Sequence, residues 1–282
     1  MKTGLIMEGG AMRGMFTAGV MDVMMEAGIE FDGAIGVSAG ACFGCNYKSK
    51  QIGRVIRYNT RFCADKRYSG MHLLLKEGNV FSTDFCYNVV PLQYDVFDFE
   101  TYEANPMEFY VVCTDIETGK AVYHKYEGLE DHGFDWIRAS ASMPLVSQIV
   151  EIEGRKYLDG GVADSIPLAF FESIGYDRNV AILTQPEGYV KKKNPLMPLV
   201  KLKYRDYPKL VEAMENRDVY YNVSLRYVEQ REAEGELLVI RPEGKLDVSK
   251  LEKDPEKLKE VYVQGRLAAT KRLAEIKGYL SK

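Results

Sequence analysis

The stretch Gly36-Val37-Ser38-Ala39-Gly40 decides how the fold of this chain is interpreted. Residues 34–37 are mostly apolar and predict a short strand, whereas residues 39–47 are small and apolar enough to predict a buried helix. A sharp turn from strand to helix forces its central side chain out of the sheet edge, and flanking glycines avoid clashes in so tight a bend. This context makes Ser38 a candidate nucleophile.

The same stretch has a simpler interpretation, in which Ser38 only caps the helix that follows, because serine is a favoured N-cap residue. In both cases the helix directs its positive end at the turn and favours negative charge there. The pentapeptide alone does not separate a reactive turn from a capped loop, so other parts of the sequence must decide.

A second strand-turn-helix pattern begins the chain. Residues 5–7 form an apolar run that ends at Gly9-Gly10, and apolar residues then recur with helical spacing as far as Gly28. Two such units in succession predict an α/β fold with a mainly parallel central sheet. Runs of β-branched and aromatic residues predict further strands at residues 108–113, 120–124, 146–152, 179–183 and 237–240.

Helices are predicted at residues 135–141 and 166–173, and a charged amphipathic helix at residues 254–280 is expected to close over the core. Residues 186–198 contain glycine, proline and three consecutive lysines, which predicts a loop. The 282 residues suffice for one α/β core, and no internal repeat marks a boundary. We therefore expect a single domain over residues 1–282.

The composition limits the classes of partner and compartment. Lys and Arg number 37 against 41 Asp and Glu, so no overall basic surface favours nucleic acid. Five cysteines form an odd set that suits reduced thiols and a cytoplasmic setting. No apolar run approaches the roughly 20 residues that span a bilayer, so any contact with lipid is expected to be peripheral.

The glycine-rich turn Glu8-Gly9-Gly10-Ala11-Met12-Arg13-Gly14 follows the first predicted strand directly. Such a turn exposes several backbone N–H groups at one point, and these can hold the oxyanion of a tetrahedral intermediate. A dinucleotide-binding loop would require glycine where Ala11 stands. A tight turn with a helix cap is the simplest alternative.

The stretch Tyr157-Leu158-Asp159-Gly160-Gly161 supplies a candidate carboxylate after a probable strand. The two glycines permit a close backbone approach, although Asp-Gly is also an ordinary turn signal. The histidines of the chain, His72, His124 and His132, all precede Asp159, so the order serine, acid, histidine of an α/β-hydrolase triad is impossible with this acid. A histidine acting from an unusual position is the less favoured alternative.

These three motifs, together with Arg138-Ala139-Ser140-Ala141-Ser142-Met143-Pro144, resemble the patatin-like phospholipase family over residues 4–167. The resemblance implies a three-layer α/β/α fold with a catalytic core at about residues 4–185 and a helical and strand extension at about residues 200–282. It also implies a serine lipid acyl hydrolase of the phospholipase A or lysophospholipase type, which needs no cofactor and acts through an acyl-enzyme on an acyl-ester lipid.

The resemblance assigns roles residue by residue. It implies a dyad in which Ser38 is the nucleophile and Asp159 the base. The implied oxyanion hole consists of the amides of Gly9, Gly10 and Ala11. The motif positions that support these assignments are Arg13, Gly14, Gly36, Gly40, Gly160 and Gly161.

Two alternatives remain open on the sequence: a general carboxylesterase or acyltransferase for soluble acyl esters, and a non-catalytic module that binds phosphate or acyl groups. Cys42 and Cys45 have redox spacing, but small residues at the start of a buried helix favour packing, and no metal site is expected. A membrane surface or a solvated helix face would each account for the basic residues and tyrosines of the second half, namely Lys191–Lys193, Lys201, Lys203, Tyr204, Arg205, Tyr207, Tyr220 and Tyr221. The oligomeric state is not indicated.

Overall fold

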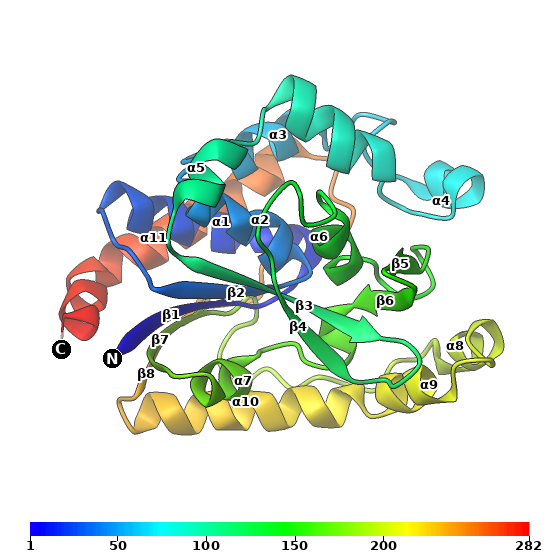
Figure 1. The fold of residues 1–282 in the computed structure, drawn as a ribbon. Helices are drawn as coiled ribbons and strands as arrows, with labels where there is room; N and C mark the ends of the chain where they lie inside the picture. The colour runs from blue at the N-terminus through cyan, green and yellow to red at the C-terminus, as the bar shows by residue number, and fades with distance from the viewer. Residues whose placement is uncertain (282) are drawn as a thin grey trace.

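The computed structural model describes residues 1–281, and one eight-stranded sheet lies at its centre (Figure 1). Lys282, the last residue of the expected extension, lies outside the described residues. The strands follow the order β5-β6-β3-β2-β1-β7-β8, and β4 pairs with β3. The parallel strands are β1 (Lys2–Met7), β2 (Gly33–Val37), β3 (Glu108–Asp115), β7 (Tyr176–Ile182) and β8 (Leu237–Ile240). The antiparallel strands are β4 (Ala121–Lys125), β5 (Val150–Ile152) and β6 (Arg155–Asp159).

The central strands are apolar on both faces, because helices cover the sheet on both sides. In β1, Leu5 and Met7 pack into one hydrophobic cluster, whereas Ile6 points into another on the opposite face. In β7, Val180 and Ala181 divide between the two clusters in the same way. The expected three-layer α/β/α architecture with a mainly parallel sheet is confirmed.

One face of the sheet carries helices from both ends of the chain: α1 (Gly14–Glu26), α2 (Ala39–Lys48), α3 (Arg54–Phe62), α5 (Phe99–Ala104), α6 (Asp135–Ser140) and α11 (Pro255–Leu280). Two glycines let α1 and α11 pack backbone to backbone. A Cβ atom on Gly19 would lie 2.0 Å from the Tyr262 carbonyl oxygen, and one on Gly265 would lie 2.0 Å from the Phe16 carbonyl oxygen. The C-terminal helix therefore lies directly against the first helix (Figure 1).

The opposite face carries α7 (Leu168–Ser173) and the long α10 (Arg217–Ala233) (Figure 1). Tyr221, Leu225 and Val228 of α10 are buried in the cluster on this face. The shorter helices α8 (Met197–Lys203) and α9 (Pro208–Glu215) precede α10 and contribute Val200 and Leu210 to a third cluster.

The segment between α3 and α5 contains α4 (Met71–Glu77) and a π-helix, η2 (Phe85–Tyr94). Pro91 lies inside η2, and its missing N–H group disrupts regular α-helical hydrogen bonding there. Two short 3₁₀ helices, η1 (Ala11–Arg13) and η3 (Gly160–Val162), follow the glycine-rich turn and Asp159. The candidate site described below is bordered by residues of α3, α4, η1, η2 and η3.

Several predicted boundaries differ from the structure, and three of the differences border the candidate site or its loops. The strand predicted at residues 146–152 is formed only at residues 150–152, because Val146 donates to the Met143 carbonyl in a turn and Gln148 donates to the Asn79 side chain. The helix predicted from residue 166 begins at Leu168, after Pro167. The loop predicted at residues 186–198 ends earlier, since α8 starts at Met197.

Candidate active site

Ser38 lies in a strained turn between β2 and α2. Its backbone has φ 56° and ψ −122°, a combination that side chains with a Cβ adopt rarely. The Ser38 N–H group donates to the buried Ser140 hydroxyl at 2.8 Å, and the Ser38 carbonyl accepts from the amides of Ala41 and Cys42. These hydrogen bonds hold the turn in its strained conformation. Only 9% of Ser38 is exposed, so its side chain faces an interior cleft.

The motif glycines allow three backbone segments to meet around this turn. A Cβ atom on Gly40 would lie 2.2 Å from the Met7 carbonyl oxygen at the end of β1, and one on Gly9 would lie 2.8 Å from the Val37 carbonyl oxygen. The same test gives an approach closer than 3.0 Å at each of Gly10, Gly14, Gly36 and Gly160. At Gly9, Gly36, Gly40 and Gly160 the nearest atoms belong to the backbone, so a larger residue would force the chain apart, whereas at Gly10 and Gly14 they belong to the side chains of Thr184 and Phe43.

Asp159 lies at the end of β6, with its backbone and side chain both fixed. Its N–H group donates to the Ser142 carbonyl at 2.9 Å, and its carbonyl accepts from the Thr114 hydroxyl at 2.8 Å. Its Oδ1 accepts from the Gly161 amide at 2.7 Å, so the second glycine of the motif orients the carboxylate.

The structure brings Ser38 and Asp159 into the same cleft, which has a volume of about 420 Å³. Burial raises the pKa of the Asp159 carboxyl, while Arg217, the hydrogen-bonding Ser38 hydroxyl and the Gly161 amide act to lower it. Removal from water is the dominant effect. A carboxylate with a raised pKa is a stronger base than an ordinary aspartate, and here it adjoins a serine hydroxyl.

The glycine-rich turn borders the same cleft, which Gly9, Gly10 and Ala11 all line. Within residues 1–281, the backbone N–H groups of these three residues have no hydrogen-bond acceptor. Ala11 has φ 50°, a left-handed conformation that costs roughly 1 kcal/mol for a residue with a Cβ. Ala11 therefore adopts a backbone conformation that a third glycine would adopt without strain, and this costs the folded protein some stability.

The buried carboxylate of Glu8 holds the glycine-rich turn in place through hydrogen bonds to two distant residues. The Thr184 amide donates to Glu8 Oε2 at 2.6 Å, and the Tyr221 hydroxyl donates to Oε1 at 2.6 Å. The Thr184 hydroxyl also donates to the Gly9 carbonyl at 3.0 Å. The sequence motif contains Glu8, but its two partners come from the end of β7 and from α10, and no local pattern could have identified them.

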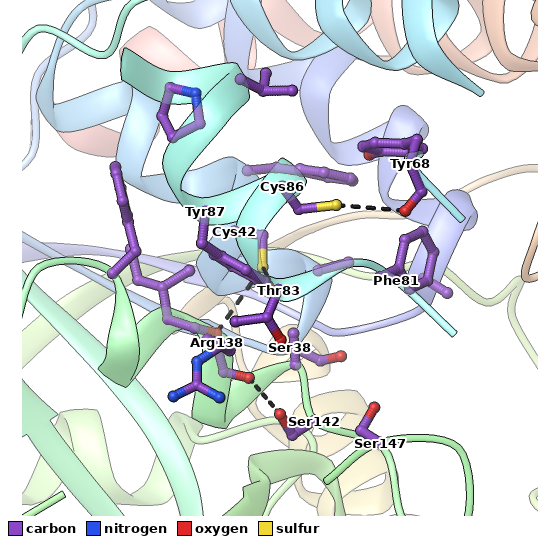
Figure 2. Close-up of a pocket in the computed structure, with 18 of the residues that line it drawn as sticks. Ser38, Cys42, Tyr68, Phe81, Thr83, Cys86, Tyr87, Arg138, Ser142 and Ser147 are labelled. Atoms are coloured by element: carbon purple, nitrogen blue, oxygen red, sulfur yellow. Dashed lines mark hydrogen bonds between the residues drawn. The ribbon is translucent and has the colours of Figure 1, made fainter. Parts of the chain in front are cut away.

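Ser38 also lines a second cavity, of about 130 Å³, whose lining is shown in Figure 2. Its lining includes Cys42, one turn along α2 from Ser38, and Tyr87 of the π-helix. The Cys42 thiol and the Tyr87 hydroxyl are 3.8 Å apart. Tyr68, Phe81, Cys86, Val90 and Pro91 complete much of the apolar wall. Ser38 therefore borders both a cleft that contains several charged side chains, called the polar cleft below, and a cavity walled mainly by aromatic, aliphatic and sulfur-containing side chains, called the apolar cavity.

The thiols of Cys42 and Cys45 are buried and are not activated as nucleophiles. Burial raises the pKa of each thiol to about 12, so both are protonated at neutral pH. No group of three or more His, Cys, Asp or Glu side chains within residues 1–281 is arranged to hold a metal ion.

None of the histidines, all of which are described, lines either cavity. His124 stacks on Trp136 and pairs with Asp131 at 2.7 Å. His132 lies beside Glu153 on the surface, and His72 contacts a backbone carbonyl.

Two tyrosines considered for a membrane surface are instead buried. Tyr204 is 2% exposed, and its hydroxyl accepts from the Leu145 amide at 3.0 Å. Tyr221 is 3% exposed, and its hydroxyl donates to Glu8. No helix among the described residues is both long and apolar enough to cross a bilayer. The cleft also contains three cations that the motifs did not indicate: Lys191, Arg217 and Lys250.

Comparison with known proteins identifies relatives of part of the chain. The uncharacterized protein YjjU of Escherichia coli strain K12 is 30% identical over 192 residues, which is 64% of this chain and 52% of the relative. The lysophospholipase nte1 of Emericella nidulans is 30% identical over 205 residues, which is 66% of this chain but 12% of the relative. The chain thus spans about half of the first relative and a small part of the second.

The crystal structure of VipD from Legionella pneumophila matches with a TM-score of 0.48 and 12% identity, covering 97% of this chain and 67% of that one. Residues 207–281 match a family described as a domain of unknown function, DUF6363. Residues 5–171, which contain all three motifs, match the family model described as patatin-like phospholipase. The chain therefore belongs to the patatin-like phospholipase family.

Proposed function

We propose that this protein is a serine lipid acyl hydrolase of the phospholipase A or lysophospholipase type, with Ser38 as nucleophile and Asp159 as base. The observation that carries the proposal is the meeting of three groups in one cleft. A strained serine, a buried carboxylate and the unpaired amides of the glycine-rich turn all border it. The fungal relative named lysophospholipase supports the substrate class.

In the first step, Asp159 accepts the Ser38 proton as the serine oxygen attacks the ester carbonyl. The amides of Gly9, Gly10 and Ala11 stabilise the oxyanion that forms. Loss of one such donor typically reduces turnover by about 10²–10³. Asp159 then returns the proton to the leaving alcohol, and the acyl group remains on Ser38.

In the second step, water attacks the acyl-enzyme. Asp159 accepts a proton from this water, and the fatty acid leaves as Ser38 regains its hydrogen. No metal or cofactor takes part in this proposal. Its only requirements are the base, the amide donors and access of water through the polar cleft.

The two cavities on either side of Ser38 suit the two halves of a lipid ester. The apolar cavity under the π-helix accommodates the acyl chain, and the polar cleft accommodates the alcohol and its headgroup. Each buried CH₂ group contributes about 0.8 kcal/mol, so acyl chains that fill the cavity bind more tightly than short ones. This arrangement favours a lipid over a small soluble ester.

Peripheral contact with a membrane, and a cytoplasmic location, stay predictions. Tyr204 and Tyr221 do not contribute to such contact, since both are buried. Leu199 and Leu202 of α8 are exposed beside the basic Lys201. These three side chains support the prediction of membrane contact better than the buried tyrosines do.

Covalent labelling tests the nucleophile. A fluorophosphonate probe is expected to label the wild-type protein and to leave Ser38→Ala unlabelled. Asp159→Asn is expected to react about 10²–10⁴ times more slowly, the usual contribution of a general base. Equal labelling of Ser38→Ala would eliminate Ser38 as the nucleophile, and folded wild-type protein that resists the probe would favour a non-catalytic binding module.

Acyl-chain selectivity tests the apolar cavity. Cys42→Phe is expected to fill space equivalent to about two CH₂ groups, so kcat/KM for p-nitrophenyl octanoate relative to the acetate should fall about 10-fold. Cys63→Ala is the matched control, because Cys63 is buried but lines neither cavity. A wild-type enzyme indifferent to chain length would instead indicate a general carboxylesterase, and an unchanged ratio in Cys42→Phe would place the acyl chain elsewhere.

Stability against pH tests the burial of Asp159. Because the pKa of Asp159 is raised in the folded protein, the stability it contributes is complete below its ordinary value of 3.8 and is lost as the pH rises through the raised value. Asp159→Asn removes the buried charge, so it should raise the melting temperature at pH 7 while it reduces activity. That gain should shrink as the pH falls toward 3.8. A variant less stable than wild type at pH 7 contradicts this account.

A further inference from the structure

Four cationic side chains line the polar cleft beside Ser38: Arg13, Lys191, Arg217 and Lys250. Within residues 1–281, none of them forms a salt bridge with a carboxylate. Arg13 Nε is buried and has no hydrogen-bond partner among the described residues. Four positive charges therefore share one cleft without direct neutralisation.

The two carboxylates of the cleft, Glu8 and Asp159, offset the four cations only in part. Glu8 accepts from the Tyr221 hydroxyl and from Thr184, and both of its oxygens are engaged. Asp159 accepts from the Gly161 amide and faces the Ser38 hydroxyl.

The cations repel one another strongly enough to affect their protonation. Burial lowers the pKa of Lys191 to about 8, and Arg217, Arg13 and Lys250 act in the same direction, opposed by Glu8. Burial also lowers the pKa of Lys250, with Arg217 and Arg13 adding to the effect and Asp159 opposing it. Like charges held together in a partly buried cleft are unfavourable unless an anion binds between them.

Local contacts hold two of the cations, Lys191 and Arg217, in place. The Lys191 ammonium lies 4.2 Å from the centre of the Tyr221 ring, and the Lys191 amide donates to the Asn222 side chain at 2.9 Å. Arg217 Nε donates to the Gly161 carbonyl at 2.5 Å, which leaves the other nitrogens of its guanidinium free to donate toward the cleft. Lys250 lies at the rim, where its side chain is only partly withdrawn from solvent.

Three of the four cations lie outside the part of the chain that matches the patatin-like family, which ends at residue 171. Arg217 begins α10, and Lys250 precedes α11, so both fall in residues 207–281, the region that matches a family of unknown function. The C-terminal region thus contributes side chains to the wall of the cleft, in addition to covering the sheet.

We propose that Lys191, Arg217 and Lys250, beside Arg13, form an anion subsite that binds the phosphate group of a phospholipid or lysophospholipid while its ester lies at Ser38. This inference rests on the proposed hydrolase function. Arginine offers a planar fork of donors to phosphate oxygens, and lysine supplies a mobile point charge. The C-terminal region therefore selects substrates that carry a phosphate headgroup.

Paired substrates test the subsite in the full chain. Lysophosphatidic acid and monoacylglycerol with the same acyl chain differ only by the phosphate, so their kcat/KM ratio reports on headgroup recognition. The wild-type ratio is expected to favour the phosphate. Lys191→Gln and Lys250→Gln are each expected to reduce the ratio about 10-fold, the loss of one charge-assisted hydrogen bond. Lys192→Gln is the matched control, since Lys192 is exposed and does not line the cleft.

A kcat/KM ratio in Lys191→Gln and Lys250→Gln equal to that of wild type would overturn the inference, and this includes an equal loss on both substrates. Calorimetric titration of Ser38→Ala with lysophosphatidic acid, and separately with inorganic phosphate, measures the subsite without hydrolysis. Suppose that the wild type hydrolyses neither substrate but that lysophosphatidic acid binds and Lys191→Gln abolishes this binding. The subsite would then be retained and the hydrolase function rejected. Binding of inorganic phosphate with no preference for the lysophospholipid would indicate a small-anion site and reject headgroup recognition.

Discussion

The close approach of the β1–α1 turn to the β2–α2 turn is the constraint on which the site depends. The two strands are parallel neighbours, with Met7 opposite Gly36, so their carboxyl ends meet at the same edge of the sheet. Only glycine at Gly40 and Gly9 lets the two backbones come together there, because a Cβ at either position would clash with a carbonyl oxygen. That contact sets Ser38 beside the unpaired amides of the glycine-rich turn. A larger residue at either glycine would separate the nucleophile from its oxyanion donors.

The carboxylate reaches the same edge through the sheet. In the register of β3, Val112 lies opposite Val37 and the next residue, Cys113, lies opposite Asp159. Asp159, at the end of β6, is thereby separated from the turn that holds Ser38 by the single strand β3. Its burial makes it more basic but also destabilises the folded state at neutral pH, so the chemistry and the stability of the fold make opposite demands on this side chain.

The sequence predicted those parts of the fold and site that depend on local patterns. Short glycine-containing motifs, each at the end of an apolar run, located the turns around Ser38, Asp159 and Gly10, because the steric demands of a tight turn involve neighbouring residues. Two strand-turn-helix units in succession predicted the parallel sheet, and runs of β-branched and aromatic residues predicted its further strands. The π-helix over the apolar cavity was not predicted, since Pro91 marks a disruption without specifying its geometry. Residues 146–149 were predicted as strand because the run 146–152 is rich in β-branched residues, but local turn and side-chain hydrogen bonds override that preference. The cationic wall of the cleft could not have been predicted, because Lys191, Arg217 and Lys250 are brought together only by the packing of the C-terminal helices.

The proposed chemistry depends above all on the action of Asp159 on the proton of residue 38. It is tested most directly by measuring the acylation burst with a p-nitrophenyl ester for Asp159→Asn in the wild-type and Ser38→Cys backgrounds at pH 9. Because a thiol is far more acidic than a serine hydroxyl and depends less on a base, the loss caused by Asp159→Asn should be about 10²–10⁴ with serine and far smaller in the Ser38→Cys background. An equal loss in both backgrounds would contradict the account.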